Sequence, residues 1–337
     1  MRKRGKYSLE FDNVYLKEAS IVGGKFEKEG PRSKFFDKLY DDNYCDTNSW
    51  EKAELRLIED AFNILLEKSN MLKKKVDLFI GGDLNNQIAI TNYFMRQNDI
   101  PYLGIYSACS SCTESLIVGS SYVDQNNGFK NVICSVSSHN ATSERQFRYP
   151  TEYGGQKPSS TTFTSTVSGM GLLSNEKSKI KISKATIGVV VDGDIKDPQD
   201  MGRAMAPAAA ITLLNHLKDF NSNIDDYDLI LTGDLSFYGS IVFKEILEKH
   251  GIYLKETYQD SGLLLYDRKK QNVYAGGSGC GCVAAITYGM VKNLLEENQI
   301  KNALIIATGA LLNPVMIAQG ESIPSIAHAV VLERCDK

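Results

Sequence analysis

The sequence lacks a hydrophobic run long enough to cross a bilayer, and it lacks a leader of the secretory kind. Its longest apolar stretch, residues 303–318, is interrupted by Asn313 and Pro314 and is too short for a membrane helix. The N-terminus carries basic residues but no apolar segment of a secretory signal. We therefore expect a protein of cytoplasmic type that reaches a membrane only through partner proteins.

The sequence also has no large excess of positive or of negative charge. The formal net charge is -3 at pH 7, and the runs of basic residues at 2–4 and 73–75 are short. Such short runs usually form solvated ends of elements. Because no overall field would attract a polyanion, we expect no nucleic-acid partner.

The cysteines do not form the pattern of a disulfide framework. Their number, seven, is odd, the chain is long, and Cys134 lies in an apolar strand-like run. Two close pairs, Cys109 with Cys112 and Cys280 with Cys282, raise the alternative of a zinc site, but C-x-C spacing fits zinc poorly. We expect free thiols, no metal and no cofactor.

The chain repeats a pattern in which a buried-strand run ends in Gly-Asp. The run at residues 76–84 contains Asp83, and a similar run at residues 227–235 contains Asp234. After each run a Ser-x-Cys sequence precedes a helical stretch, once at Cys109 and once at Cys280, and another strand-like run follows. Landmarks that recur in the same order indicate an internal duplication.

Helical patterns alternate with these strands, as at residues 48–69 and 208–220. This alternation predicts crossover units and a largely parallel sheet in each half. The sequence therefore predicts a duplicated α/β fold, with an N-terminal half at 1–185 and a C-terminal half at 186–337. In such sheets, sites gather at the carboxyl ends of strands and the amino ends of helices.

Cys109 and His139 lie at such ends. Backbone amides and the helix dipole are expected to lower the pKa of the Cys109 thiol and to hold a carboxylate or an oxyanion. The alternative is a buried small hydrophobic side chain. His139 follows a strand and could pair with Cys109 to form an acyl-enzyme, or could instead order the loop after it by hydrogen bonds. Asp83 and Asp234 are expected to cap the next helices, with catalysis as the alternative.

The segment 140–158 is predicted to be a long polar loop that leaves this edge. It interleaves three cations with three aromatic residues: Arg145, Arg148 and Lys157 with Phe147, Tyr149 and Tyr153. Guanidinium groups bind carboxylates through two hydrogen bonds, and aromatic faces suit a planar ring. The same composition also suits a contact between subunits.

At these residues the chain resembles thiolases and ketoacyl synthases, which are duplicated folds with a nucleophilic cysteine at an Ala-Cys-Ser helix start. Residues 164–171 resemble the glycine-rich strand that closes their first half. A closer resemblance, over nearly the whole chain, is to the stage V sporulation protein AD family. It is carried by the phrases at 81–86, 137–158, 204–210, 275–280 and 307–312, of which the long loop phrase is the most specific.

The resemblance to the enzymes implies a duplicated, five-layered α/β/α/β/α fold. The resemblance to the sporulation family implies a homodimer that binds dipicolinic acid (pyridine-2,6-dicarboxylate) and supports its uptake into the developing bacterial spore. It further implies membrane subunits of the SpoVA complex as partners and a peripheral place at the inner membrane of the spore. Whether calcium accompanies the ligand is left open.

The sequence departs from the enzymes where their second half brings catalytic histidines. The corresponding segments 232–234, 276–279 and 308–309 contain no histidine. Condensation needs a base and groups that hold an enolate, and glycines supply amides but no base. We therefore expect a binding protein rather than an enzyme. A Cys109-dependent acyltransferase or thioesterase is the alternative, and a purely structural subunit is a third.

The expected ligand contacts follow from charge. One carboxylate of dipicolinate would meet the amides near Cys109, and the other a cation of the loop, since unpaired charge in a half-buried site is costly. Arg145 is the first choice, with Arg148 and Lys157 behind it. His139 and Asp83 complete the candidate ligand-binding residues.

Overall fold

The computed structural model describes residues 1–125, 128–148 and 156–335. Ten principal strands follow the order β13-β12-β15-β16-β10-β3-β9-β7-β5-β6, which divides into two sets of five with the same internal plan. In each set two strand pairs beside the outer edge are parallel, and the inner pairs are antiparallel. The duplicated α/β architecture predicted from the sequence is present.

The first set spans the N-terminal part of the chain. Its strands are β3 (Tyr15–Gly23), β5 (Leu78–Gly82), β6 (Tyr102–Gly104), β7 (Asn131–Ser138) and β9 (Val167–Ser174). The second set contains β10 (Ile180–Thr186), β12 (Leu229–Thr232), β13 (Tyr258–Asp260), β15 (Asn302–Ala310) and β16 (Pro324–Arg334). All eight residues of β9 are buried, as are eight of the nine residues of β15, so both faces of these sheets are covered.

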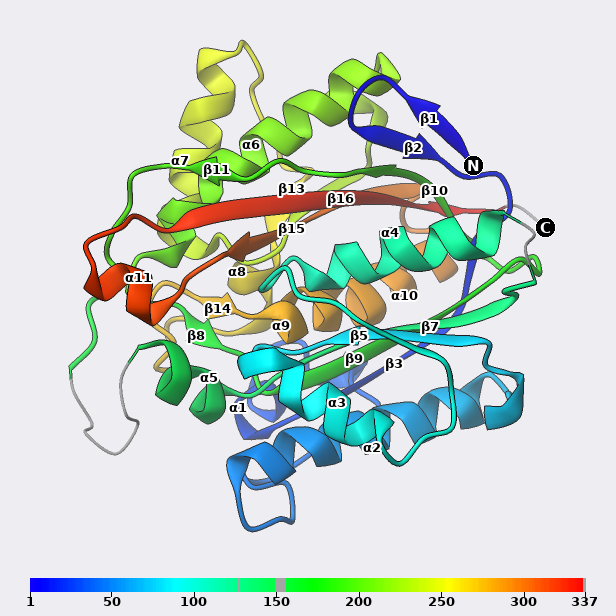
Figure 1. Ribbon diagram of the computed structural model, residues 1–337. Helices are drawn as coiled ribbons and strands as arrows, with labels where there is room; N and C mark the ends of the chain where they lie inside the picture. The colour runs from blue at the N-terminus through cyan, green and yellow to red at the C-terminus, as the bar shows by residue number, and fades with distance from the viewer. Residues whose placement is uncertain (126–127, 149–155, 336–337) are drawn as a thin grey trace.

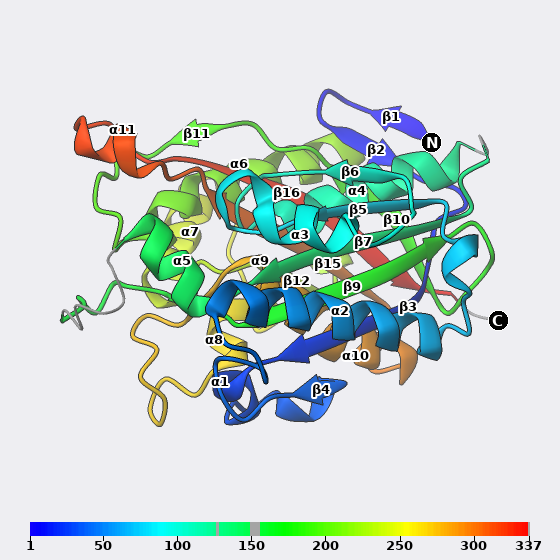
Figure 2. The same ribbon diagram turned by 60° about the horizontal axis from the view of Figure 1, so that its bottom comes forward.

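Three layers of helices enclose the two sheets (Figure 1). The principal helices are α2 (Trp50–Lys68), α3 (Ala89–Met95), α4 (Ser111–Asp124), α6 (Met201–Phe220), α7 (Ser236–Lys249), and α9 (Cys280–Ala285), which continues through a π-helical segment, η6 (Ile286–Val291), into α10 (Lys292–Glu296). The helices α4, α9 and α10 lie between the sheets. α2 lies along the outer face of the first sheet, as Figure 2 shows, and α6 covers the second. The layers are therefore α/β/α/β/α.

Shorter elements complete the chain. They are β1 (Arg2–Arg4), β2 (Ser8–Glu10), α1 (Lys25–Lys28), η1 (Ser33–Phe35), β4 (Lys38–Leu39), η2 (Lys73–Lys75), η3 (Asn86–Ile88), α5 (Asn140–Phe147), β8 (Phe163–Thr164), β11 (Val191–Asp192), η5 (Ile224–Asp226), α8 (Ser261–Leu265), β14 (Gly277–Ser278) and α11 (Pro314–Ala318). The first part of the predicted polar loop is thus a helix, α5. Tyr149 and Tyr153, which were predicted to lie in that loop, fall outside the described residues.

The helix α2 illustrates how sequence pattern sets these layers. Ala53, Leu57, Ala61 and Leu65 recur at helical spacing and are all buried against the first sheet. The helix begins after Ser49, whose hydroxyl accepts a hydrogen bond from the backbone N–H of Lys52. Because the apolar spacing is visible in the sequence, this helix was predictable from it.

The equivalent places of β3 and β10 in the repeat indicate where the boundary between the halves lies. In the sheet order β10 takes the place in the second set that β3 takes in the first, and the two strands pair only at Ile180 with Leu16 and Lys181 with Tyr15. A division after residue 185 would cut β10. We therefore propose that the halves meet between β9 and β10, a few residues before the boundary expected from the sequence.

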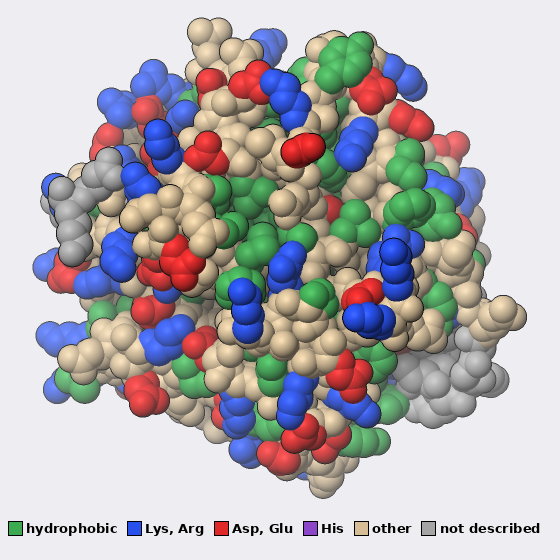
Figure 3. Space-filling model, turned by 180° about the vertical axis from the view of Figure 1, so that it is seen from behind, with side chains coloured by type: hydrophobic (Ala, Val, Ile, Leu, Met, Phe, Trp, Pro, Cys, Tyr) green, Lys and Arg blue, Asp and Glu red, His purple; other side chains and the backbone are tan. Residues whose placement is uncertain are grey.

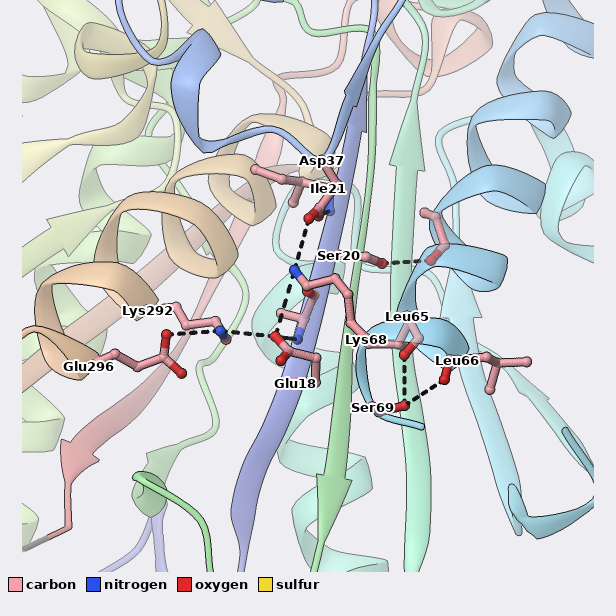
Figure 4. Close-up of polar contacts among 12 residues, drawn as sticks. Glu18, Ser20, Ile21, Asp37, Leu65, Leu66, Lys68, Ser69, Lys292 and Glu296 are labelled. Atoms are coloured by element: carbon pink, nitrogen blue, oxygen red, sulfur yellow. Dashed lines mark hydrogen bonds and ion pairs between the residues drawn. The ribbon is translucent and has the colours of Figure 1, made fainter. Parts of the chain in front are cut away.

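A cluster of ion pairs joins the halves where α10 passes β3 (Figure 4). The ammonium of Lys292 contacts Glu18 at 2.9 Å and Glu296 at 3.0 Å. Glu18 also faces Lys68 at 3.7 Å, and Lys68 pairs with Asp37 at 2.8 Å. The side chain of Lys292 is only 12% exposed, so this cluster is better shielded from solvent than an ordinary surface pair.

The surface shows mixed charge on the face drawn in Figure 3, where basic and acidic side chains are interspersed with small apolar areas. Over the described residues, no helix combines the length and the apolar character that crossing a membrane requires.

Candidate functional site

Two adjoining hollows lie where the carboxyl ends of both sheets meet. The inner cavity, about 30 Å³, is lined by Leu84, Tyr106, Ala108, Cys109, Ser143, Phe147, Arg148, Thr164, Met201, Ser278, Ala310 and Leu312. The outer cleft, about 490 Å³, is lined by Asn85, Asn86, Gln87, Ile88, Gly104, Ile105, Tyr106, Gln146, Phe147, Leu311, Leu312, Asn313 and Pro314. Both linings include Tyr106, Phe147 and Leu312, so the cleft and the cavity share a wall.

Cys109 lies in a tight turn just before α4. Ala108 has a φ of 49°, a left-handed conformation that is unusual for alanine. The carbonyl of Ser107 at this turn comes so close to Gly309, at the end of β15, that a Cβ on Gly309 would lie 2.4 Å from it. The end of a second-half strand therefore supports the turn that presents Cys109.

The predicted activation of Cys109 by the helix start was wrong. The residue Cys109 is 7% exposed, and burial raises the pKa of its thiol well above the usual value, an effect that the neighbouring Asp234 and Cys280 increase. The amides of Ser110 and Ser111 donate to the carbonyls of Ser107 and Ala108, so they are engaged within the turn. The pKa of this thiol is therefore raised rather than lowered, and the amides of Ser110 and Ser111 are not free to hold a carboxylate.

Asp234 is the acid that faces this thiol, and it does not cap α7 as predicted. Its carboxylate accepts hydrogen bonds from the hydroxyl of Thr308 at 2.6 Å, the hydroxyl of Ser278 at 2.9 Å and the amide of Gly279 at 3.0 Å. The capping role belongs instead to Asp260, which accepts from the amides that begin α7 and α8.

The structure does not form the predicted pair of Cys109 with His139. The Nδ1 atom of His139 accepts from the amide of Ala141 and caps α5, and its Nε2 atom donates to the carbonyl of Asn43 at 2.8 Å. Burial lowers its pKa to about 4, so the ring is neutral. His139 therefore orders the start of α5, which was the alternative prediction.

Arg145, the first choice among the cations, points away from the cavity. Its guanidinium forms an ion pair with Glu51 and lies over the ring of Trp50 at 5.2 Å, with 43% of its side chain exposed. The preference for Arg145 was wrong, because the segment is a helix that turns this residue to the surface.

Arg148 is the cation that lines the inner cavity. Its side chain is 1% exposed, it forms an ion pair with Glu144, and one of its nitrogens donates to the carbonyl of Thr162 at 3.1 Å. Lys157 pairs with the other oxygen of Glu144 at 2.7 Å without reaching the lining. Two cations thus share a single buried carboxylate, which leaves one positive charge in excess beside the cavity.

Two polar atoms of the cavity lining have no partner among the described residues. They are Nε of Arg148 and the hydroxyl of Ser143, and each is buried. A buried donor without an acceptor costs free energy, so native structures rarely leave one unless a water or ligand satisfies it. These atoms mark the place where an anionic oxygen would be held.

Asp83 lies outside both linings. Its carboxylate accepts from the amide and the hydroxyl of Thr91 in α3, at 2.8 and 2.7 Å, and from the amide of Asn85 at 2.8 Å. This confirms the predicted capping role and gives no support to its place among the ligand-binding residues. A second buried acid, Glu54, accepts from Ser137, Asn85 and Thr142.

Sequence reasoning missed Ser143, Glu144, Glu54 and the role of Asp234. The Gly-Asp repeat singled out Asp234, but only the fold places its carboxylate against Cys109. Glu144 and Arg148 are four residues apart, a spacing that brings side chains together on a helix. Had the segment been interpreted as helical, this pair could have been predicted.

Comparisons with known proteins agree with this architecture. Residues 5–333 match the family model for stage V sporulation protein AD. The stage V sporulation protein AD of Bacillus subtilis is 48% identical over 336 residues, covering 99% of this chain and 98% of that protein.

Solved structures show the same fold at low identity. Human mitochondrial 3-ketoacyl-CoA thiolase superposes with a TM-score of 0.58 at 13% identity, over 96% of this chain and 98% of that one. The synthase III for 3-oxoacyl-acyl-carrier-protein from Aquifex aeolicus gives 0.52 at 13% identity, over 98% and 100%. A variant of OleA from Xanthomonas campestris gives 0.60 at 10% identity, over 96% and 99%. The fold is thiolase-like, and by its sequence the chain belongs to the stage V sporulation protein AD family.

Proposed function

We propose that this sporulation protein binds dipicolinate in the joined hollows beside Cys109 and supports its uptake into the developing spore without acting as an enzyme. The observation that carries the proposal is the buried guanidinium of Arg148, which belongs to the cavity lining and whose Nε atom has no partner among the described residues. A carboxylate is the planar anion that such a group binds best.

The sizes of the hollows suggest how the ligand lies. The inner cavity of about 30 Å³ has room for one or two water molecules, and hence for one carboxylate group rather than a ring. The outer cleft is large enough for the pyridine ring, which would lie by Tyr106 and Phe147. The second carboxylate would then face the side-chain amides of Asn86, Gln146 and Asn313.

The placement of the histidines supports the non-enzymatic part of the proposal. All four histidines lie in the described segments, and none contacts Cys109. Three use both ring nitrogens elsewhere: His139 as above, His216 with Thr186 and Tyr227, and His328 with Ser107 and the amide of Gly188. The fourth, His250, is exposed at the end of α7. A cysteine-dependent acyltransferase or thioesterase that used a histidine as its base would need one of them beside Cys109.

Family membership supports the remaining parts of the proposal. We propose that the protein is a homodimer that works with membrane subunits of the SpoVA complex at the inner membrane of the developing spore. The ligand would be dipicolinate itself or its calcium chelate.

Titration calorimetry with dipicolinate tests the binding site. The test variants are Arg148→Lys, which keeps the charge but loses the Nε donor, and Ser143→Ala. A lost charge-assisted hydrogen bond is worth about 1.5–3 kcal/mol, so Arg148→Lys should weaken binding by about 10- to 100-fold. Ser143→Ala should weaken it less, since a hydroxyl is a neutral donor.

Arg145→Ala is the matched control, because Arg145 lies on the same helix end but points to solvent. It should bind dipicolinate as the wild type does. Benzoate, with a single carboxylate, should bind more weakly than dipicolinate to every variant. Wild-type affinity in Arg148→Lys, or equal affinity for the two ligands, would show that this cavity does not recognise the dianion.

A further inference from the structure

Glu144, on α5, carries a buried carboxylate that two cations share. One of its oxygens contacts the guanidinium of Arg148, and the other lies 2.7 Å from the ammonium of Lys157. Glu144 and Arg148 are almost fully buried, and the side chain of Lys157 is 21% exposed. In the described part of the chain, neither cation forms an ion pair with another carboxylate. Two positive charges therefore face one negative charge in a place largely shielded from water.

The hydrogen bonds of Arg148 show which part of its guanidinium is left for a ligand. One terminal nitrogen donates to the carbonyl of Thr162 at 3.1 Å, and the other is held by Glu144 and lies 3.4 Å from the hydroxyl of Thr164. The Nε atom has no partner among the described residues, and neither has the hydroxyl of Ser143 in the same cavity lining. Glu144 therefore orients the guanidinium without satisfying all of its donors.

Lys157 can contribute to this cluster in two ways. As an anchor, it would only tie its own part of the chain to α5 through the ion pair with Glu144. As a balancing charge, it would neutralise Glu144 and so leave the positive charge of Arg148 for a ligand. Without Lys157, Arg148 and Glu144 would form a neutral pair, and a neutral pair attracts a nearby anion only weakly.

The cost of buried charge favours the second role. A carboxylate that is already paired with a guanidinium needs no further cation, and an excess charge in a shielded place raises the free energy of the folded state. An anion in the cavity would offset this cost, because two negative charges would then face two positive ones. The inner cavity has room for a single carboxylate group, which supplies one such charge.

We propose that Lys157 determines the affinity of the inner cavity for a carboxylate by neutralising Glu144, although Lys157 does not belong to the cavity lining. The positive charge of Arg148 then remains for the ligand, with its Nε atom and the hydroxyl of Ser143 as the donors. Lys157 acts through Glu144, so it is a positioning residue and not a ligand contact. This role rests on the proposed binding of dipicolinate, and it adds a residue that controls how tightly the dianion is held.

Titration calorimetry with dipicolinate tests this role on variants of the full-length protein. Lys157→Gln removes the balancing charge and should weaken binding by about tenfold, since a unit charge acts over several ångströms in a shielded site. Lys157→Arg keeps the charge and should retain most of the affinity. The double variant Glu144→Gln/Lys157→Gln leaves Arg148 unbalanced again, and it should bind dipicolinate more tightly than Lys157→Gln alone.

This rescue separates the two roles of Lys157. If Lys157 were only an anchor, the second substitution would remove a further contact and could not restore binding. Arg145→Gln is the matched control, because it removes a positive charge from the exposed face of the same helix, and it should bind as the wild type does. Wild-type affinity in Lys157→Gln would overturn the inference, as would a double variant that binds no better than Lys157→Gln.

Urea denaturation without ligand tests the charge arrangement independently of binding. In Glu144→Gln, the cations of Lys157 and Arg148 have lost the carboxylate between them, so adding Lys157→Gln should raise the urea midpoint of that variant. A Glu144→Gln protein that folds only together with Lys157→Gln would give the same answer. An unchanged or lower midpoint would show that the charge of Lys157 does not act on Arg148, and would refute the inference.

The two measurements distinguish the proposals. A wild type that binds no dipicolinate would refute the proposed function, and the urea series would still decide whether the charge of Lys157 acts on Arg148. A wild type that binds dipicolinate, together with a Lys157→Gln variant of equal affinity, would refute the role of Lys157 alone.

Discussion

At the scale of single residues, burial determines whether an acidic side chain is charged in the folded protein. Glu54 lies on α2 with no exposed surface and accepts hydrogen bonds from Ser137 at 2.7 Å, Asn85 at 3.0 Å and Thr142 at 3.1 Å. Burial, with the nearby Asp83 as a further cause, raises its pKa from 4.5 to about 8. No cation is among its contacts in the described segments, so the folded protein favours the protonated, neutral form of Glu54.

This pKa has a consequence for stability. Because the folded-state value exceeds the unfolded value, the folded protein binds more protons between about pH 4.5 and pH 8, and Glu54 makes stability fall as pH rises across that range. Glu54→Gln imitates the neutral acid. It should therefore raise the free energy of unfolding at pH 8 by about 2–4 kcal/mol, since each pKa unit is worth about 1.4 kcal/mol.

Urea denaturation at pH 5 and pH 8 measures this effect. The advantage of Glu54→Gln should shrink toward pH 5, where the wild-type side chain is protonated. Glu67→Gln, an exposed position on the same helix, should change stability by less than about 0.5 kcal/mol at either pH. An advantage of Glu54→Gln that is equal at both values would show that ionisation of Glu54 is not the cause.

The residues of the candidate site were only partly predictable. Cys109 was found because a cysteine before an apolar helix is visible in the sequence, and its place in the lining follows from the chain order of strand and helix. Whether its thiol is activated could not be predicted, since its pKa depends first on burial and then on Asp234, which is far away in sequence. Residues three apart on a helix share a face, so the sequence pattern offered no reason to separate Arg145 from Arg148. Arg148 lines the cavity because it follows α5 with a non-helical backbone, which only the structure shows.

At the scale of elements, the contact of α10 with β3 joins Lys292 to Glu18, two residues that lie far apart in the sequence. Here Lys292 balances Glu18 with only 12% and 21% of the two side chains exposed. Removal of one partner from a shielded pair leaves the other charge uncompensated, which costs more than the loss of a surface pair. The sequence could not predict this contact, because neither residue belongs to a motif.

Lys292→Ala should lower the free energy of unfolding by about 1–3 kcal/mol, because Glu18 would retain only the more distant Lys68. Lys255→Ala is the control, since Lys255 pairs with Asp225 where both side chains are more than half exposed. That variant should lose about 0.5 kcal/mol or less. Chemical denaturation measures the free energy of unfolding of the two variants. Equal losses would mean that the partly buried ion pair contributes no more to stability than the exposed one.

At the scale of the whole molecule, the sequence predicted the order of the repeated elements. It did not predict the contacts between the two halves. The Gly-Asp runs became β5 and β12, neighbours of β7 and β15 in equivalent places. The hairpin of β1 and β2, however, comes from the N-terminus and pairs with β10 of the second set. Its short strands have no hydrophobic alternation, so the sequence pattern could not predict a pairing with a strand so distant in the chain.

The central helices lead to a prediction for unfolding. The helix α4 belongs to the first half in sequence but contacts β15 and β16, and α9 belongs to the second half but contacts β7 and β9. Each sheet therefore has one face covered by a helix of the other half, and neither half could bury its apolar face alone. Because separation would expose that face, the full chain should unfold in one transition, with the same midpoint by far-ultraviolet circular dichroism and by the fluorescence of Trp50 in the first half. Two separated midpoints would show that the halves are independently stable, and would mean that the central layer contributes little to holding them together.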